Sequence, residues 1–331
     1  MSESRNILEI RDLAVDFTTD EGVLSAVDGV SFDVRPNEVL GLVGESGCGK
    51  SVTAMSLLRL VPDPPGKIRE GTVHLDGTEL LGLSPKQLRR VRGAEVSVIF
   101  QDPATALSPL HRVGDQLAEV LRIHGRAGKK EAAQQAVEWL RRVGISNPAE
   151  NASAYPHEMS GGMQQRIVIA MALMMGPRLV IADEPTTALD VTISAQIFDL
   201  LRGMREERTS VLLITHDLGV IWEMCQRVLV MYAGKIVEEG LRDDLFDHPS
   251  HPYTQGLLRS VPRLTGEKDE LYTIEGSVPS PLEYPRGCRF NTRCPHAFDR
   301  CFAEEPDLFV YGPHRRVACY LAERWLEARR G

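Results

Sequence analysis

The chain has no long hydrophobic run, no excess of basic residues and no hydrophobic segment at its amino terminus. Its longest apolar run, residues 167–175, falls short of the ~18 residues that a membrane-spanning helix needs. The formal net charge of −8 gives no reason to expect nucleic-acid binding, which favours a basic face. Residues 1–6 are polar and lack the hydrophobic core of a signal peptide. We therefore expect a cytoplasmic protein, soluble or peripheral to a membrane, with no nucleic-acid partner.

Internal repeats and low-complexity segments are also lacking, and 331 residues with 43% hydrophobic content can build one large core and a second small one. Short, unbroken apolar runs are typical of parallel strands buried on both faces. Such runs lie at residues 39–43, 96–100, 179–182 and 211–214. Residues 8–17 and 22–34 alternate between apolar and polar types, which predicts an antiparallel flanking sheet. The predicted fold class is α/β, with a mixed sheet covered by helices.

Residues 44–51, Gly-Glu-Ser-Gly-Cys-Gly-Lys-Ser, fit the phosphate-binding pattern G-x-x-x-x-G-K-[ST]. The apolar run before them and a helix-like stretch after them, residues 51–60, give the strand-loop-helix setting that a phosphate cradle requires. Lys50 is placed to reach the terminal phosphates of ATP, and the Ser51 hydroxyl is placed to bind Mg²⁺. The nucleotide-binding residues expected here are Gly44, Ser46, Gly47, Cys48, Gly49, Lys50, Ser51 and Val52.

Two acidic residues end the apolar run 179–182. Because open α/β sheets bind ligands at the carboxyl ends of their strands, we expect Asp183 to bind Mg²⁺ and Glu184 to orient or deprotonate the attacking water. Taken alone, this pair is equally well explained as an acidic cap on the next loop. His216 follows the apolar run 211–214, where it can donate a hydrogen bond to a phosphate oxygen, although a lone histidine is more often structural.

The segment 159–166, Met-Ser-Gly-Gly-Met-Gln-Gln-Arg, lies between these motifs. Taken together in this order, the motifs resemble the nucleotide-binding subunits of ABC transporters, from about Leu8 to Gly240. The resemblance implies a P-loop NTPase of the ABC cassette type with a helical subdomain at about residues 102–175. It also implies that the permease docks on this subdomain, near residues 105–114.

In that family two cassettes pair head to tail, which implies that Ser160, Gly161 and Gly162 contact the γ-phosphate held by a second cassette. A hydroxyl donor and bare N–H groups at the start of a helix suit that contact. The sequence departs from the commonest family signature at Met163, where glutamine is usual, so no nucleotide contact is carried over to that side chain.

The same resemblance assigns roles to residues outside the main motifs. It implies that Gln101 senses the metal ion and the water, that Asp190 lies in the loop that crosses the dimer interface, and that His216 is the switch histidine. Phe17 lies where the family places an aromatic residue against adenine, and a buried core phenylalanine is the equal alternative.

Four of the six cysteines, Cys288, Cys294, Cys301 and Cys319, fall in one stretch near the carboxyl terminus. Disulfides are improbable in a cytoplasmic protein, so metal ligation is the leading explanation. The gaps between successive cysteines, of five, six and seventeen residues, disfavour zinc, because structural zinc sites usually include a close cysteine pair. Four thiolates can instead hold an iron-sulfur cluster. Nearby arginines could offset the cluster charge or form a solvated basic surface: Arg289, Arg293, Arg300, Arg315 and Arg316.

This region also resembles the tail of ATP-binding subunits of dipeptide, oligopeptide and nickel importers, on His251-Pro-Tyr-Thr254, Gly287-Cys-Arg-Phe290 and Arg293-Cys-Pro295. The resemblance implies a 4Fe-4S cluster held by Cys288, Cys294, Cys301 and Cys319, with zinc as the alternative. Of the other thiols, Cys48 is expected to have a pKa lowered by the helix amino terminus, and Cys225 is expected in the core.

We expect a nucleotide-binding domain at residues 1–245 and a cysteine-rich extension at residues 246–331. The implied function is an ATP-hydrolysing subunit of an ABC importer that drives uptake of di- and oligopeptides. Its implied partners are a second cassette, in a heterodimer, two transmembrane permease subunits and an extracytoplasmic solute-binding protein. The protein would then lie on the cytoplasmic face of the inner membrane. The alternatives are a nickel-importer ATPase and a soluble ABC ATPase that acts on ribosomes or in DNA repair.

Overall fold

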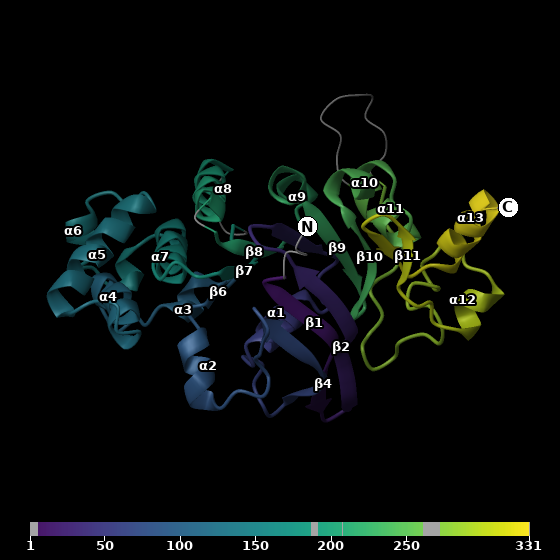
Figure 1. Ribbon diagram of the computed structural model, residues 1–331, viewed down its shortest axis with the longest axis horizontal. Coiled ribbons are helices and arrows are strands. Elements are labelled where there is room, and N and C mark those ends of the chain that lie inside the picture. The colour runs from purple at the N-terminus through teal and green to yellow at the C-terminus, as the bar shows by residue number, and fades with distance from the viewer. Residues whose placement is uncertain (1–5, 187–190, 207, 261–271, 331) are drawn as a thin grey trace. The chain divides into compact units, whose positions relative to one another are not determined.

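The computed structural model describes residues 6–186, 191–206, 208–260 and 272–330. Two units are distinguished by their backbone contacts, and each combines several stretches of the chain. Unit 1 is assigned Met1–Ile7, Val34–Glu38 and Gly82–Leu213, and unit 2 is assigned Leu8–Asp33, Val39–Leu81 and Ile214–Gly331. Figure 1 labels the helices and strands.

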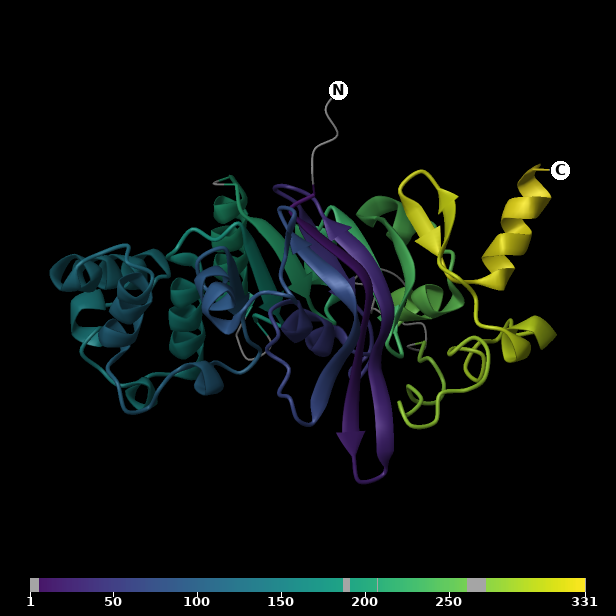
Figure 2. The ribbon, with the colours of Figure 1, turned by 60° about the horizontal axis from the view of Figure 1, so that its bottom comes forward.

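A four-stranded sheet in unit 2 has the order β2-β1-β4-β5. Its strands are β1 (Leu8–Thr19), β2 (Gly22–Val34), β4 (Gly66–Leu75) and β5 (Thr78–Glu79). Figure 2 shows β1 and β2 as a long hairpin, and β4 pairs antiparallel with β1. The antiparallel sheet predicted from the alternation of residues 8–34 is confirmed.

Unit 2 also contains five strands in the order β11-β12-β10-β9-β3. They are β3 (Val39–Val43), β9 (Arg227–Tyr232), β10 (Lys235–Leu241), β11 (Phe309–Gly312) and β12 (Arg315–Val317). The pair β3–β9 is parallel, and the other pairs are antiparallel. Every residue of β3 and β9 is buried, as expected of an unbroken apolar run between covering layers.

The helices of unit 2 follow the strands that carry functional motifs or belong to the carboxyl-terminal region. They are α1 (Lys50–Leu57), α9 (Leu218–Met224), α10 (Arg242–Asp247), α11 (Pro252–Arg259), α12 (Asp299–Ala303) and α13 (Tyr320–Arg330). Helix α11 begins with Pro252, which is favoured there because it lacks the N–H that a helix start leaves unpaired. His251 caps the helix, and its side chain accepts a hydrogen bond from Tyr253 N. Figure 2 shows α12, α13 and the β11–β12 hairpin in yellow-green and yellow.

Unit 1 contains β6 (Val96–Ile99), β7 (Leu179–Asp183) and β8 (Ser210–Ile214), in the order β8-β7-β6. Strands β6 and β7 are parallel, with Val96 opposite Leu179. All residues of β7 and β8 are buried. Each strand matches a predicted apolar run to within one residue at either end, because a run that is apolar on both faces has few alternatives to a central strand.

Helices form most of the rest of unit 1, as predicted for residues 102–175. They are α2 (Pro85–Val91), α3 (Pro103–Ala106), α4 (Val113–Ile123), α5 (Lys129–Arg142), α6 (Pro148–Asn151), a 3-10 turn (Pro156–Glu158), α7 (Gly161–Leu173) and α8 (Val191–Glu206). Figure 1 shows α4, α5 and α7 side by side, and the apolar stripes of α4 and α5 are buried between them, including Leu117 and Leu140.

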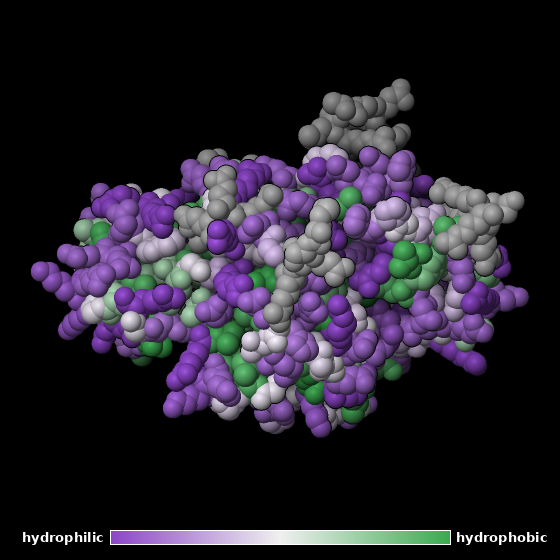
Figure 3. Space-filling view, in the orientation of Figure 1, coloured by the Kyte–Doolittle hydropathy of each residue, from purple (hydrophilic) through white to green (hydrophobic). Residues whose placement is uncertain are grey.

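Among the residues that the structure describes, no helix is long and apolar enough to cross a membrane. The face drawn in Figure 3 is mostly hydrophilic, with hydrophobic side chains in small separate areas.

Candidate nucleotide site and carboxyl-terminal region

The predicted phosphate-binding loop, residues 44–51, leaves β3 and enters α1 through a backbone that only glycine accommodates. Gly44, Gly47 and Gly49 have φ angles of +155°, +80° and +107°. A Cβ on Gly44 would lie 2.2 Å from the carbonyl oxygen of Met231, and one on Gly49 would lie 2.5 Å from that of Ala26. The loop therefore packs backbone against backbone, and the motif glycines are required by both conformation and space.

Lys50 lies within this loop. Its side chain is 6% exposed, and its Nζ donates to the carbonyl oxygens of Gly44 at 2.8 Å and Glu45 at 3.0 Å. Ser51 follows in the first turn of α1 and is partly exposed. A buried ammonium group in a glycine-rich loop at the amino terminus of a helix suits a polyphosphate, so these residues fit ATP with Mg²⁺.

The pKa of Cys48 differs from the one expected. Its side chain is fully buried, and burial raises the pKa of the thiol although Lys50 Nζ lies 3.8 Å from Sγ. The predicted lowering of its pKa is wrong, because loss of solvation outweighs the nearby positive charge and the helix terminus. Cys225 is 1% exposed, and its predicted place in the core is confirmed.

In unit 1 the structure brings together two of the predicted catalytic residues. Gln101 Nε2 donates to Glu184 Oε2 at 3.1 Å. Asp183 ends β7 and is 4% exposed, whereas Glu184 has a φ of +47° and is partly exposed. A left-handed conformation at a glutamate costs free energy, and such strain is concentrated at functional sites. The fold thus brings the Gln101 amide and the Glu184 carboxylate within hydrogen-bond distance.

The signature residues of unit 1 form the start of α7. Ser160 caps this helix, and its Oγ accepts a hydrogen bond from Met163 N at 3.3 Å. Ser160 and Gly161 are exposed, and Gly162 is partly exposed. The exposed helix start thus offers N–H groups and a hydroxyl to a molecule outside the chain.

Sequence reasoning missed Gln165, which joins α7 to the loop after Glu184. Its side chain is 3% exposed, and its Nε2 donates to the carbonyl oxygen of Pro185 at 2.8 Å. Gln165 stands between two other polar residues, Gln164 and Arg166, so the sequence did not show which of the three would be buried and need a hydrogen-bond partner. This hydrogen bond therefore links α7 directly to the loop that follows Asp183 and Glu184.

The structure also describes two further predicted residues, His216 and Phe17. His216 is exposed after β8, and Asp217 caps α9 by accepting from Gly219 N at 2.8 Å. Phe17 is partly buried near the end of β1, opposite Gly66 of β4, so it is neither a core residue nor fully exposed. Asp190 lies outside the described residues.

The four clustered cysteines do not form the predicted metal site. They line a cavity of about 20 Å³, which is space for about one water molecule. Among the described residues, no group of three or more His, Cys, Asp or Glu side chains is placed to hold a metal ion. The prediction of a 4Fe-4S cluster, or of zinc, at Cys288, Cys294, Cys301 and Cys319 is therefore wrong.

Burial makes the clustered thiols difficult to ionise. Loss of solvation raises the pKa of Cys288 to about 12 and that of Cys319 to about 11, and it also raises the pKa of Cys294. Metal ligation requires thiolates, and a raised pKa makes these thiolates more costly to form. All four cysteines are partly buried and line the same small cavity.

A glycine loop around a buried lysine, with an Asp-Glu pair at the end of another buried strand, defines the P-loop ATPases. A family model described as "ABC transporter" matches residues 27–187, and one described as "Oligopeptide/dipeptide transporter, C-terminal region" matches residues 237–301. The chain belongs to the ABC transporter family and contains an ABC-type ATPase domain.

Similar proteins match over nearly the whole chain. The "Probable peptide ABC transporter ATP-binding protein y4tR" of Sinorhizobium fredii is 52% identical over 95% of this chain and 94% of its own length. In Bacillus subtilis, the "Oligopeptide transport ATP-binding protein AppD" is 48% identical over 96% of this chain and 97% of its own. The "Dipeptide transport ATP-binding protein DppD" of the same species is 48% identical over 97% of this chain and 96% of its own.

Two solved structures match about 71% of the chain. The dimeric ABC transporter cassette MJ0796 has a TM-score of 0.64 and 27% identity, covering 71% of this chain and 98% of its own. A dimeric post-hydrolysis state of the same cassette, bound to ADP and Pi, has a TM-score of 0.65 and 26% identity, with the same coverage. The chain thus has the P-loop ABC cassette fold, with a mixed sheet and helices.

Proposed function

We propose that the chain is the ATP-hydrolysing subunit of an importer that takes up di- and oligopeptides. The observation that supports this proposal is similarity over at least 95% of the chain to proteins named for peptide, oligopeptide and dipeptide transport. The similarity includes the region that matches the oligopeptide/dipeptide transporter model, residues 237–301, which lies beyond the cassette motifs.

In the proposed chemistry each of the predicted residues has its own role. Lys50 and the N–H groups of residues 44–51 hold the phosphates, and Ser51, Gln101 and Asp183 hold Mg²⁺, which neutralises phosphate charge when bound. Glu184 orients the attacking water with Gln101, whose amide is 3.1 Å from its carboxylate. His216 donates a hydrogen bond to a phosphate oxygen, and Phe17 stacks on the adenine. The other nucleotide-binding residues are Gly44, Ser46, Gly47, Cys48, Gly49 and Val52.

A second cassette completes each site in this proposal. The exposed start of α7, with Ser160, Gly161 and Gly162, is available for the nucleotide held by that partner. Asp190 is assigned to the same interface. We propose that the partner is a related but different chain, and that each site is composite because ATP binds the two cassettes together.

The remaining partners follow from the transport role. Two permease subunits dock on the helical region, about residues 102–175, where Leu110 is 80% exposed next to α4. A solute-binding protein delivers the peptide from outside, and the chain lies on the cytoplasmic face of the membrane. The nucleotide-binding domain is assigned to residues 1–245, and residues 246–331 form the cysteine-rich extension.

Uptake of a radiolabelled dipeptide tests this function in a strain that lacks the gene. We expect the wild-type gene to restore uptake, and the Lys50→Ala and Glu184→Gln variants to fail. In the purified chain, Glu184→Gln should bind ATP normally but lower turnover by about 100- to 10,000-fold, because it removes a proton acceptor and keeps the side-chain shape. Restoration of nickel uptake without peptide uptake would contradict the cargo. Unchanged hydrolysis in Glu184→Gln would contradict the assigned role of the glutamate.

A further inference from the structure

The phosphate-binding loop is contacted by two residues from the far end of the chain, and both contacts are made to Glu45. The phenolic oxygen of Tyr253 accepts a hydrogen bond from Glu45 N at 2.8 Å. Arg293 donates to the Glu45 carboxylate from both arms of its guanidinium group, at 3.0 Å to Oε1 and 3.1 Å to Oε2. This two-armed geometry is the strongest and most directional form of an Arg-carboxylate pair.

Arg293 is itself immobilised. Only 4% of its side chain is exposed, and it also donates to the carbonyl oxygens of Ile274 at 3.3 Å, Glu275 at 2.9 Å and Gly276 at 3.4 Å. A further bond reaches the Tyr232 phenolic oxygen at 3.3 Å. An arginine fixed by so many partners holds the Glu45 carboxylate in one place and pays little additional side-chain entropy for doing so.

Tyr253 is equally well fixed. It lies on α11 and is fully buried, with its ring 4.6 Å from that of Tyr232 and 5.5 Å from that of Phe290. Its backbone N–H donates to Nδ1 of His251 at 3.0 Å, which anchors the start of α11. The phenolic oxygen therefore has a defined position from which to accept the Glu45 N–H.

Glu45 is thus held at three points. Its N–H is bound by Tyr253, its carboxylate by Arg293, and its carbonyl oxygen by Nζ of Lys50 at 3.0 Å. The first two contacts come from the carboxyl-terminal region and the third comes from the lysine that the motif requires. A displaced Glu45 would move the carbonyl to which this lysine is bonded, and an unpaired carboxylate here would repel the phosphates.

We propose that Arg293 and Tyr253 are positioning residues for ATP, so that the carboxyl-terminal region sets the affinity of the phosphate-binding loop through Glu45. This inference rests on the proposed role of residues 44–51 in holding the triphosphate. The motif leaves position 45 open to any residue, so the contact is a property of this chain's own extension and not of P-loops in general.

Binding of Mg-ATP to the purified full-length chain tests the proposal. We expect Arg293→Gln to raise the Kd about tenfold, within the range typical of coupling between sites, while kcat at saturating ATP stays within about twofold. Arg293→Lys keeps the charge but not the two-armed geometry, so it should recover part of the affinity. A purely structural loss would lower the melting temperature and kcat without this separation of Kd from kcat.

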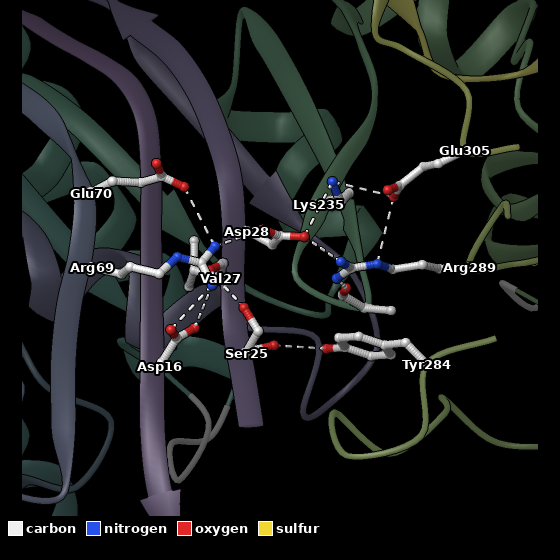
Figure 4. Close-up of polar contacts among 11 residues, drawn as sticks. Asp16, Ser25, Val27, Asp28, Arg69, Glu70, Lys235, Tyr284, Arg289 and Glu305 are labelled. Atoms are coloured by element: carbon white, nitrogen blue, oxygen red, sulfur yellow. Dashed lines mark hydrogen bonds and ion pairs between the residues drawn. The ribbon is translucent and has the colours of Figure 1, made fainter. Parts of the chain in front are cut away.

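Arg289 provides the matched control, because it also ties the carboxyl-terminal region to the rest of unit 2. It pairs with Asp28 and donates to the carbonyl oxygen of Ala233, and Asp28 in turn pairs with Lys235 and Arg69 (Figure 4). Within the part of the chain that the structure describes, Arg289 forms no hydrogen bond or ion pair with residues 44–51. Arg289→Gln should therefore leave the Kd within about twofold of wild type.

A double-mutant cycle decides whether the effect passes through Glu45. In a Glu45→Gln background, Arg293→Gln should change the Kd less than about twofold, because the pair is already broken. If Arg293→Gln does not fold, Tyr253→Phe keeps the buried ring and should raise the Kd about threefold by removing one hydrogen bond.

Several results would overturn the proposal. They are a wild-type Kd in Arg293→Gln, an equal loss of affinity in Arg289→Gln, or the same effect of Arg293→Gln in both Glu45 backgrounds. Lys50→Ala separates this outcome from failure of the proposed function. If Lys50→Ala loses binding while Arg293→Gln does not, only the positioning role is wrong. If Lys50→Ala binds ATP as wild type does, the assigned nucleotide site is wrong.

Discussion

Replacing Gly44 by alanine should disrupt the phosphate-binding loop more than the same change three residues later. The added Cβ would lie 2.2 Å from the carbonyl oxygen of Met231 and 2.8 Å from Sγ of Cys48. The oxygen belongs to the backbone of β9 and cannot rotate away as a side chain would. Gly44 also has a φ of +155°, a conformation that residues with a Cβ rarely adopt.

The magnitude follows from these two effects. Separating Cβ from the Met231 oxygen to ordinary contact requires a shift of at least about 1 Å, and such overpacking costs about 2 kcal/mol. The unfavourable φ adds about 2 kcal/mol. At about 2 °C for each kcal/mol in a chain of this size, the melting temperature should fall by about 8 °C. A displacement of about 1 Å in a loop that positions phosphates should lower kcat/KM for ATP by about 100-fold.

Gly47→Ala is the matched control, because a Cβ on Gly47 meets nothing within 4 Å and only the φ of +80° opposes it. Its free energy of unfolding should fall by about 1 kcal/mol, which lowers the melting temperature by about 2 °C. Both variants are compared by thermal unfolding without nucleotide and by phosphate release with Mg-ATP. The reasoning fails if Gly44→Ala melts at the same temperature as Gly47→Ala, since the contact with Met231 would then carry no cost.

The other predictions concern buried groups. Arg227 is 2% exposed and pairs with Glu239 and Asp33, so Arg227→Met should lower the free energy of unfolding, measured in urea, by about 3 kcal/mol. An unchanged free energy of unfolding would show that the pairs contribute nothing. Burial lowers the pKa of His251 to about 3, so stability should fall by up to about 1.4 kcal/mol per pH unit as pH drops from 6.5 toward 3, and His251→Asn should flatten this slope. Iodoacetamide should not label Cys48 in the native chain with or without ATP, and labelling there would contradict its burial.

Much of the sheet could be predicted because its strands are local sequence features. The runs at 39–43, 179–182 and 211–214 are apolar at every position, and β3, β7 and β8 occupy them almost residue for residue. The apolar stripes on α4 and α5, which include Leu117 and Leu140, also recur in the sequence at a helical period. In each case, a single period of hydrophobic residues determines both the element and the face that it buries.

Contacts between residues distant in sequence could not be predicted in this way. The bond from Gln165 to the carbonyl oxygen of Pro185 depends on how α7 packs beside the loop after β7, and no local pattern encodes that distance. The same holds for Glu45, which the phosphate-binding motif treats as an arbitrary residue. Its partners, Tyr253 and Arg293, follow it by more than 200 residues.

Cysteines were the least predictable residues, because their chemistry depends on solvation and not on spacing. Clustering at 288–319 suggested ligands, and a helix start suggested a reactive thiol at Cys48. In both places burial raises the pKa, so the thiols stay protonated. Sequence locates a cysteine beside another group, but only the fold shows how much water remains around it.

The arginines near the carboxyl terminus show how the extension is attached to the rest of unit 2. A solvated basic surface would leave them facing water, and a cluster would draw them toward the cysteines, yet most pair with acidic residues of the preceding strands and loops. The pairs are Arg289 with Asp28, Arg293 with Glu45, Arg315 with Glu238, and Arg316 with Glu239. Arg300 pairs within the extension, with Glu304 and Glu323, and Arg289 also pairs there, with Glu305. Because Glu238 and Glu239 are almost fully buried, losing their arginines would leave carboxylates without compensation, which is far more costly than losing a surface pair. The buried Glu238 and Glu239 therefore depend on arginines of the extension. Another of these pairs, Arg293 with Glu45, reaches the predicted phosphate-binding loop.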